Sequence, residues 1–247
     1  MSVFTRFRAI EDKDKSAVVR KLMEASTPDF DFFYFVALST LMAAFGLLLD
    51  SASIVIGSML IAPILYPILG VALGLVMSNY GVFTRSIVTL TKPLGLGCGL
   101  PAVATFFFSN GIEIQTIFEI MNRTEVSLMH FFVAVIAGAA ASFALAQPDW
   151  SETLPGIAIS VALIPPVAVI GIGLASLDFE VVAGSTQMLV VNLFGVMSAA
   201  MVSFSLMNLY EKQRVAETTI KKENERVEEE TKAIEKLDKD LKNGQNK

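Results

Sequence analysis

The chain has 247 residues, of which 53% are hydrophobic and 17% carry a charge. Soluble domains have about 25% charged residues, so this composition excludes an ordinary soluble domain and indicates an integral membrane protein. Only three of the 19 lysines and arginines, namely Arg85, Lys92 and Arg123, lie between residues 27 and 210. Most of the charged residues therefore lie in the polar ends, and the net charge of −5 gives no sign of a nucleic-acid partner.

The apolar runs predict a short polar start followed by six membrane spans. Residues 1–26 mix acids and bases, with a short helix possible over residues 14–25. Thr27, Pro28 and Asp29 predict a helix start, with Thr27 as the cap, because proline and acids suit the first turn. A span needs about 20 apolar residues as helix. The predicted spans cover residues 30–49, 52–77, 83–108, 128–146, 153–177 and 183–209. The loop at 109–127 could hold a short interfacial helix.

Prolines interrupt the second and the fifth of these spans. Each removes a backbone donor and clashes with the preceding turn. In a membrane such a break is tolerated where the freed carbonyls are buried in protein or face a water-filled cavity. Either segment alone could be a structural kink, but their matching positions favour a functional role. A serine precedes the prolines in both cases: Ser58 with Pro63 and Pro67, and Ser160 with Pro165 and Pro166.

The two halves of the chain have the same order of features, namely three spans, then a loop, then three spans. Lys92 and Asn192 occupy the two third spans, and each is followed three positions later by a glycine. Because each half has an odd number of spans, the second half begins on the opposite side of the membrane from the first. The second half must therefore be inverted relative to the first. The sequence predicts an all-α, polytopic membrane protein of six transmembrane helices. These form two inverted three-helix repeats (about 30–108 and 128–210) with proline-broken second and fifth helices.

Inverted repeats with broken helices point to a transporter site at the middle of the membrane. Two half-helix N-termini would meet there and present partial positive charge. If Lys92 faces the same site, the site favours an anion or the carboxylate of a zwitterion; alternatively Lys92 extends to the inner interface. The predicted substrate-binding residues are Ser58, Pro63, Pro67, Lys92, Ser160, Pro165, Pro166 and Asn192.

Charge near the span ends sets the orientation and the domain boundaries. Cytoplasmic termini leave only Arg123 outside, as the positive-inside rule requires, so we expect a multi-pass protein of the inner (plasma) membrane. We divide the chain into a cytosolic segment (1–29), a membrane domain (30–210) and a cytosolic helix (211–247). Ile220, Val227, Ile234 and Leu241 recur every seven residues in that last segment, with Leu237 as a companion. The pattern fits a weak coiled coil, which would imply a homo-oligomer, or a solvated helix.

Three stretches resemble one known family. They are residues 57–68 (GSMLIAPILYPI), 46–51 (GLLLDS) and 155–171 (PGIAISVALIPPVAVIG), and Asn192 matches an asparagine of the family's last span. The chain resembles the prokaryotic membrane family known as domain of unknown function 389, or "uncharacterised hydrophobic domain", over about residues 30–210. This resemblance implies a membrane protein and no particular activity.

The expected function is secondary transport of a small solute, anionic or zwitterionic, by alternating access around a midplane site. The alternatives are an oligomeric channel and a membrane scaffold or sensor that signals through its C-terminal helix. An enzyme is not expected, because the chain has one histidine and one cysteine, Cys98, and no zinc-type motif. The expected partners are the lipid bilayer, a small solute or ion and further copies of the chain. No cofactor is expected.

Overall fold

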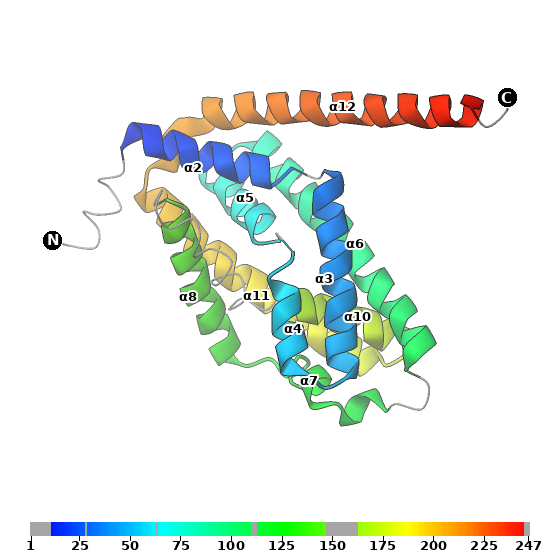
Figure 1. Cartoon of the computed structure of the whole chain (residues 1–247). Coiled ribbons are helices and arrows are strands. Elements are labelled where there is room, and N and C mark those ends of the chain that lie inside the picture. Colours follow the sequence, from blue (N-terminus) through cyan, green and yellow to red (C-terminus); the bar gives the residue numbers. More distant parts are fainter. Residues whose placement is uncertain (1–10, 28, 63, 110–112, 147–162, 245–247) are drawn as a thin grey trace.

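The computed structural model describes residues 11–27, 29–62, 64–109, 113–146 and 163–244, and every regular element within them is helical. Two shorter apolar helices, α5 (Leu65–Val76) and α10 (Ile164–Ala175), lie among longer ones (Figure 1). The prediction of an all-helical chain is confirmed for the part that the structure describes. The helices long and apolar enough to cross a membrane are α3 (Phe30–Leu48), α6 (Tyr80–Phe108), α8 (Leu128–Leu145) and α11 (Phe179–Leu206).

The first long helix begins at Phe30, where the first span was expected, but its cap is Asp29 and not Thr27. Asp29 caps α3, and its carboxylate accepts a hydrogen bond from the N–H of Phe32 at 2.9 Å. The Thr27 hydroxyl instead donates to the carbonyl of Met23, near the end of α2 (Asp12–Ala25). Thr27 therefore closes the preceding helix, whereas the Asp29 carboxylate meets the positive end of the next.

One type of turn closes three helix hairpins, which are α3–α4 (α4 is Ala52–Met59), α5–α6 and α10–α11. In each, a glycine carbonyl accepts the N–H of the residue five positions later, and the residue before that donor has a positive φ; this is the Schellman arrangement. The three bonds are Ser51 to Gly46 (2.8 Å), Asn79 to Gly74 (3.0 Å) and Asp178 to Gly173 (2.9 Å), with positive φ at Asp50, Ser78 and Leu177.

Glycine is required in these turns because the second helix of the hairpin packs against it. A Cβ at Gly74 would lie 2.7 Å from the backbone nitrogen of Phe83, and one at Gly46 would lie 2.9 Å from that of Val55. Real Cβ atoms do not approach other atoms so closely. The glycines thus let the two helices of each hairpin run in close contact.

The short helices α5 and α10 form the centre of the bundle. Residues 67–74 of α5 and 164–169 of α10 are all buried, as expected for helices that are apolar all round. Each has 12 residues, about 18 Å at 1.5 Å per residue, which is shorter than the roughly 30 Å hydrocarbon core of a bilayer. The helix α6 packs against α3, α5 and α10, and α11 packs against α5, α8 and α10.

The two ends of the bundle carry different elements. The helices α2 and α12 (Gln213–Gly244) lie across one end, and α12 continues past α6 (Figure 1). The short helices η1 (Ile114–Thr116) and α7 (Phe118–Met121) lie at the opposite end. The loop that could hold a short helix therefore holds two.

Candidate functional site

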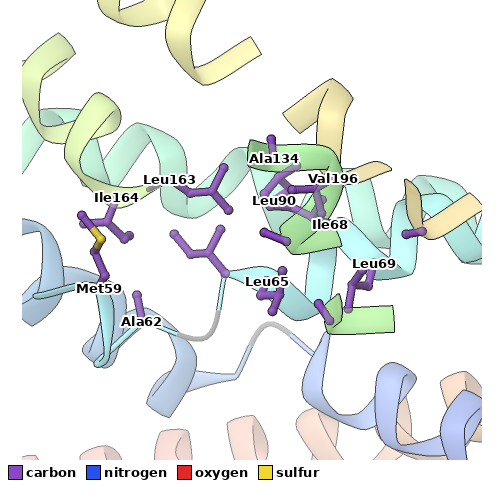
Figure 2. Close-up of a cluster of buried hydrophobic side chains, with 14 of the residues drawn as sticks. Met59, Ala62, Leu65, Ile68, Leu69, Leu90, Ala134, Leu163, Ile164 and Val196 are labelled. Carbon is purple, nitrogen blue, oxygen red and sulfur yellow. The ribbon is translucent and has the colours of Figure 1, made fainter. Parts of the chain in front are cut away.

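The helix ends near the predicted proline breaks meet inside the bundle. The helix α4 ends at Met59, α5 begins at Leu65 and α10 begins at Ile164. The side chains of Met59, Ala62, Leu65, Leu163 and Ile164 fill the space between these ends (Figure 2), and each is at most 8% exposed. We call these five residues the junction. Its contents are apolar and buried.

Hydroxyl groups satisfy the backbone where α4 ends. The buried Ser39 hydroxyl of α3 donates to the carbonyl of Ser58 at 2.6 Å. The Ser58 hydroxyl, which is also buried, donates to the carbonyl of Val55 at 2.6 Å. A helix that ends in an apolar interior leaves its last carbonyls without partners within the helix. The Ser39 hydroxyl is such a partner for the Ser58 carbonyl, which also accepts the backbone N–H of Ile61 at 3.2 Å. Ser58, predicted to bind substrate, thus has a structural role here.

Of the prolines predicted to bind substrate, the three that the structure describes lie in the first turns of the two short helices. Pro67 is the third residue of α5, and Pro165 and Pro166 follow the first residue of α10. All three are buried. The first N–H groups of a helix have no partner within it, and proline has no N–H to leave unpaired. The prolines therefore let α5 and α10 begin in an apolar interior with fewer unpaired donors, while the helix dipole remains.

The other predicted site residues differ in their positions. Asn192 is buried on α11. Lys92 is exposed on α6, whereas the adjacent Pro93 is buried. A Cβ at Gly95 or Gly99, on the same side of α6 as Lys92, would find no atom within 4 Å. The structure thus brings Ser58 and the prolines to the region of the junction and places Lys92 on an outward face. Pro63 and Ser160 lie outside the described residues.

A polar region that the sequence analysis did not identify lies where α12 meets the bundle. The Arg85 guanidinium of α6 donates to the side-chain oxygens of Asn224 and Thr27, the latter at 3.1 Å. Nearby, the Asn79 amide donates to the Glu217 carboxylate at 2.8 Å. A hollow of about 680 Å³ opens beside Arg85. Its signal in the sequence is the isolated Arg85 near the start of a span, to which the positive-inside rule gives a meaning only for orientation.

The heptad pattern of α12 is partly explained by this contact. Ile220 and Val227 line the hollow beside Arg85, so the first half of the pattern faces the chain's own bundle. Ile234 is 61% exposed. Leu237 and Leu241 lie outside the part whose side chains are described. A coiled coil with a second copy remains a prediction.

At the opposite end, the segment between the halves is bound to two of the hairpin turns. The Asp50 carboxylate accepts from the backbone N–H of Glu119 at 2.8 Å, and the Asp178 carboxylate accepts from the Gln115 amide at 2.8 Å. The bond from Gln115, followed by the backbone N–H of Val181, holds the pKa of Asp178 below its ordinary value. Despite these acids, no group of three His, Cys, Asp or Glu residues in the described ranges could hold a metal ion.

Comparison with known proteins places the chain in a family. The model of the family "Domain of unknown function (DUF389)" matches residues 59–198, more than half of the chain. An uncharacterized protein of Methanocaldococcus jannaschii is 27% identical over 168 residues, which cover 68% of this chain and 51% of that protein. The chain thus spans about half the length of this curated relative. No solved structure matches. The family match shows that the chain belongs to the domain of unknown function 389 family.

Proposed function

We propose that the protein crosses the membrane six times, with α4 and α5 together forming the second crossing. Their 8 and 12 residues give about 12 and 18 Å of helix, which together match the roughly 30 Å hydrocarbon core. The side-chain contacts support this path. Asp50 and Asp178 both bind the 113–121 segment, whereas Asn79 binds α12 at the other end. The fifth crossing combines α10 with residues before Leu163, which lie outside the described residues.

Cysteine labelling in intact cells tests this path. With Cys98 replaced by serine, Glu113→Cys should react with a membrane-impermeant maleimide, and Lys221→Cys should react only after the cells are opened. Four crossings by the long helices alone would put both positions on the same side of the membrane. Equal labelling of the two positions in intact cells would therefore exclude the six-crossing path.

We further propose that the two halves are inverted repeats. The hairpins α5–α6 and α10–α11 share their turn, and Pro67 and Pro166 precede the turn glycines, Gly74 and Gly173, by the same distance. In the six-crossing path these turns lie on opposite sides of the membrane, as inversion requires. When the two halves are aligned by their turn glycines, Asn192 aligns with Pro93, which is the residue next to Lys92. Asn192 and Lys92 are thus adjacent in register, not equivalent.

On this architecture we propose a secondary transporter of a small anionic or zwitterionic solute that works by alternating access. The observation that carries the proposal is the pair of buried 12-residue helices, α5 and α10, whose N-termini begin inside the bundle. Half-helix N-termini of this kind attract anionic groups in transporters. The proline-rich first turns leave few donors, so attraction would come mainly from the helix dipoles. The expected preference for an anion also depended on a Lys92 side chain that faces the site. Because Lys92 lies on an outward face of α6, it supports that preference less than expected.

The junction would act as the closed gate between the two sides. We expect reconstituted protein to show saturable flux of one or more members of a panel of carboxylates, amino acids and inorganic anions. Met59→Ala, which removes side-chain volume from the junction, should increase the flux. Leu60→Ala is the matched control, because Leu60 is 52% exposed. Transport of cations only, or equal effects of the two substitutions, would contradict the proposal.

The same assay separates the two alternatives. Flux that rises linearly with solute concentration would favour an oligomeric channel. For a scaffold or sensor, α12 would be the signalling element. Removal of residues 211–247 should then change the cell in the same way as loss of the whole protein. A shortened chain that still replaces the whole protein in cells would count against that role.

A further inference from the structure

A second hollow lies between α2 and α12, at the end of the bundle that carries these two helices. Its volume is about 380 Å³, within the usual range of small-ligand sites. The two helices run side by side in the same direction, since Lys212 pairs with Asp12 at 2.5 Å and Arg226 pairs with Asp29 at 3.3 Å. The hollow lies between these two ion pairs along the helices.

Helical spacing brings basic side chains to this hollow from both sides. Arg214, Thr218 and Lys222 follow one another at four-residue intervals on α12, and Arg20 and Glu24 have the same spacing on α2. Residues four apart lie on one face of a helix. Three cations and a single acid therefore line the same hollow.

None of these three cations has an ion-pair partner among the described residues. Arg20, Arg214 and Lys222 take part in no side-chain hydrogen bond or ion pair within the described ranges, although Lys212 and Arg226 on the same interface are paired. Arg85, beside the larger hollow, has already bonded Asn224 and Thr27. The α2–α12 hollow thus keeps its donors and its positive charge available for a ligand.

We propose that the α2–α12 hollow binds a phosphate-bearing anion. Two guanidinium groups suit the planar, bidentate recognition of phosphate, and a lysine adds a point charge. A phosphate monoester carries close to two negative charges at neutral pH, which matches the excess of three cations over one acid, whereas the phosphodiester of a lipid headgroup carries one. The phosphate could belong to a soluble metabolite or to an anionic lipid headgroup, since basic pockets beside a membrane bind such headgroups. The bound anion would link α12 to α2.

The test uses the full chain in a neutral detergent and in nanodiscs. Pyrophosphate is titrated by calorimetry at low and at physiological salt. In parallel, phosphatidylglycerol retained by the protein is counted by native mass spectrometry after nanodiscs of phosphatidylcholine with phosphatidylglycerol are dissociated. The triple variant Arg20→Gln, Arg214→Gln, Lys222→Gln removes the cations of the hollow. The control Lys13→Gln, Lys221→Gln, Lys236→Gln removes the same charge from exposed positions that do not line the hollow.

We expect the first triple variant, and not the control, to weaken binding by about tenfold or more, as the loss of several charge-assisted contacts predicts. Loss of saturable pyrophosphate binding would assign the site to a soluble ligand. Loss of retained phosphatidylglycerol without any pyrophosphate binding would assign it to a lipid headgroup. Equal weakening by both triple variants, or no saturable binding in either arm, would overturn the proposal. None of these readouts requires transport, so the result is independent of the proposed function.

Discussion

Asn79 and Asp178 hold the same position in two hairpin turns. The backbone N–H of Asn79 donates to Gly74 at 3.0 Å, and that of Asp178 donates to Gly173 at 2.9 Å. Each side chain then accepts the backbone N–H three residues later, at 3.0 and 3.2 Å respectively. One residue thus ends a short buried helix and caps the long helix that follows. This dual role fixes the angle at which α5 meets α6 and α10 meets α11.

The turn glycines should therefore be sensitive to any side chain. For Gly74→Ala we expect destabilisation of about 1–3 kcal/mol, because the new Cβ would overlap the backbone of Phe83. Gly95→Ala is the matched control, since its Cβ would meet no atom within 4 Å. Thermal unfolding in detergent, followed by loss of the monodisperse elution peak, measures both. Similar melting temperatures for the two variants would show that the hairpin tolerates a wider separation of its helices.

The hairpin turns are visible in the sequence as a repeated pattern. Residues 46–51, 74–79 and 173–178 read GLLLDS, GLVMSN and GLASLD, so the repeated turn is visible as a glycine–leucine pair followed by a polar cap. Only the first of these three is among the stretches that carry the family resemblance. The long apolar helices follow directly from hydropathy, which explains why their boundaries agree within a few residues.

The orientation of each helix about its axis could not be predicted in the same way. Lys92 and the buried Pro93 are adjacent in the chain, and only packing decides which of them faces inward. Gly97 packs against Val167 and Thr40, whereas Gly95 lies open; all are apolar or small, so hydropathy does not separate them. Contacts between distant segments are likewise not specified by local sequence: Arg85 stands out as an isolated charge, but nothing near it in the chain indicates that its partners are Thr27 and Asn224.

Removal of the Ser39 hydroxyl should weaken the end of α4. Ser39→Ala removes the 2.6 Å bond to the buried carbonyl of Ser58, which keeps the backbone N–H of Ile61 as a partner, and the loss of one such bond costs about 0.5–1.5 kcal/mol. The control is Ser53→Ala, because Ser53 is exposed. Unfolding monitored by circular dichroism in increasing denaturing detergent compares the two. If Ser39→Ala unfolds at the same point as Ser53→Ala, the end of α4 does not depend on this bond.

Acid should loosen the segment bound by Asp178. The hydrogen bond from Gln115 and that from the Val181 backbone hold the pKa of Asp178 below its ordinary value of 3.8. A lowered pKa in the folded state means that the ionised carboxylate stabilises the fold above pH 3.8, and that this contribution is lost as the pH falls through the lowered value. The melting temperature of the native chain should therefore fall as the pH drops below 3.8.

Asp178→Asn should be less stable at neutral pH and should lose less stability in that acid window. Glu180→Gln, a neighbouring exposed acid, serves as the control and should keep the native pH dependence. An Asp178→Asn variant with the full acid-induced decrease would show that other carboxylates account for it.

The attachment of α12 to the bundle should depend on Arg85. Its guanidinium joins Thr27 at the end of α2 and Asn224 on α12, so Arg85→Gln removes one charged group that holds three helices together. Truncation of one partner of a charge-assisted hydrogen bond costs about 1.5–3 kcal/mol, which corresponds to an opening of α12 that is roughly ten- to 150-fold more frequent. Hydrogen–deuterium exchange over residues 213–226 should rise accordingly. Lys232→Gln is the control, because Lys232 pairs with Glu228 on its own helix, and an exposed pair of this kind contributes about 0.3–0.5 kcal/mol. Unchanged exchange in Arg85→Gln would mean that the Asn79–Glu217 and Lys212–Asp12 contacts suffice to hold α12 in place.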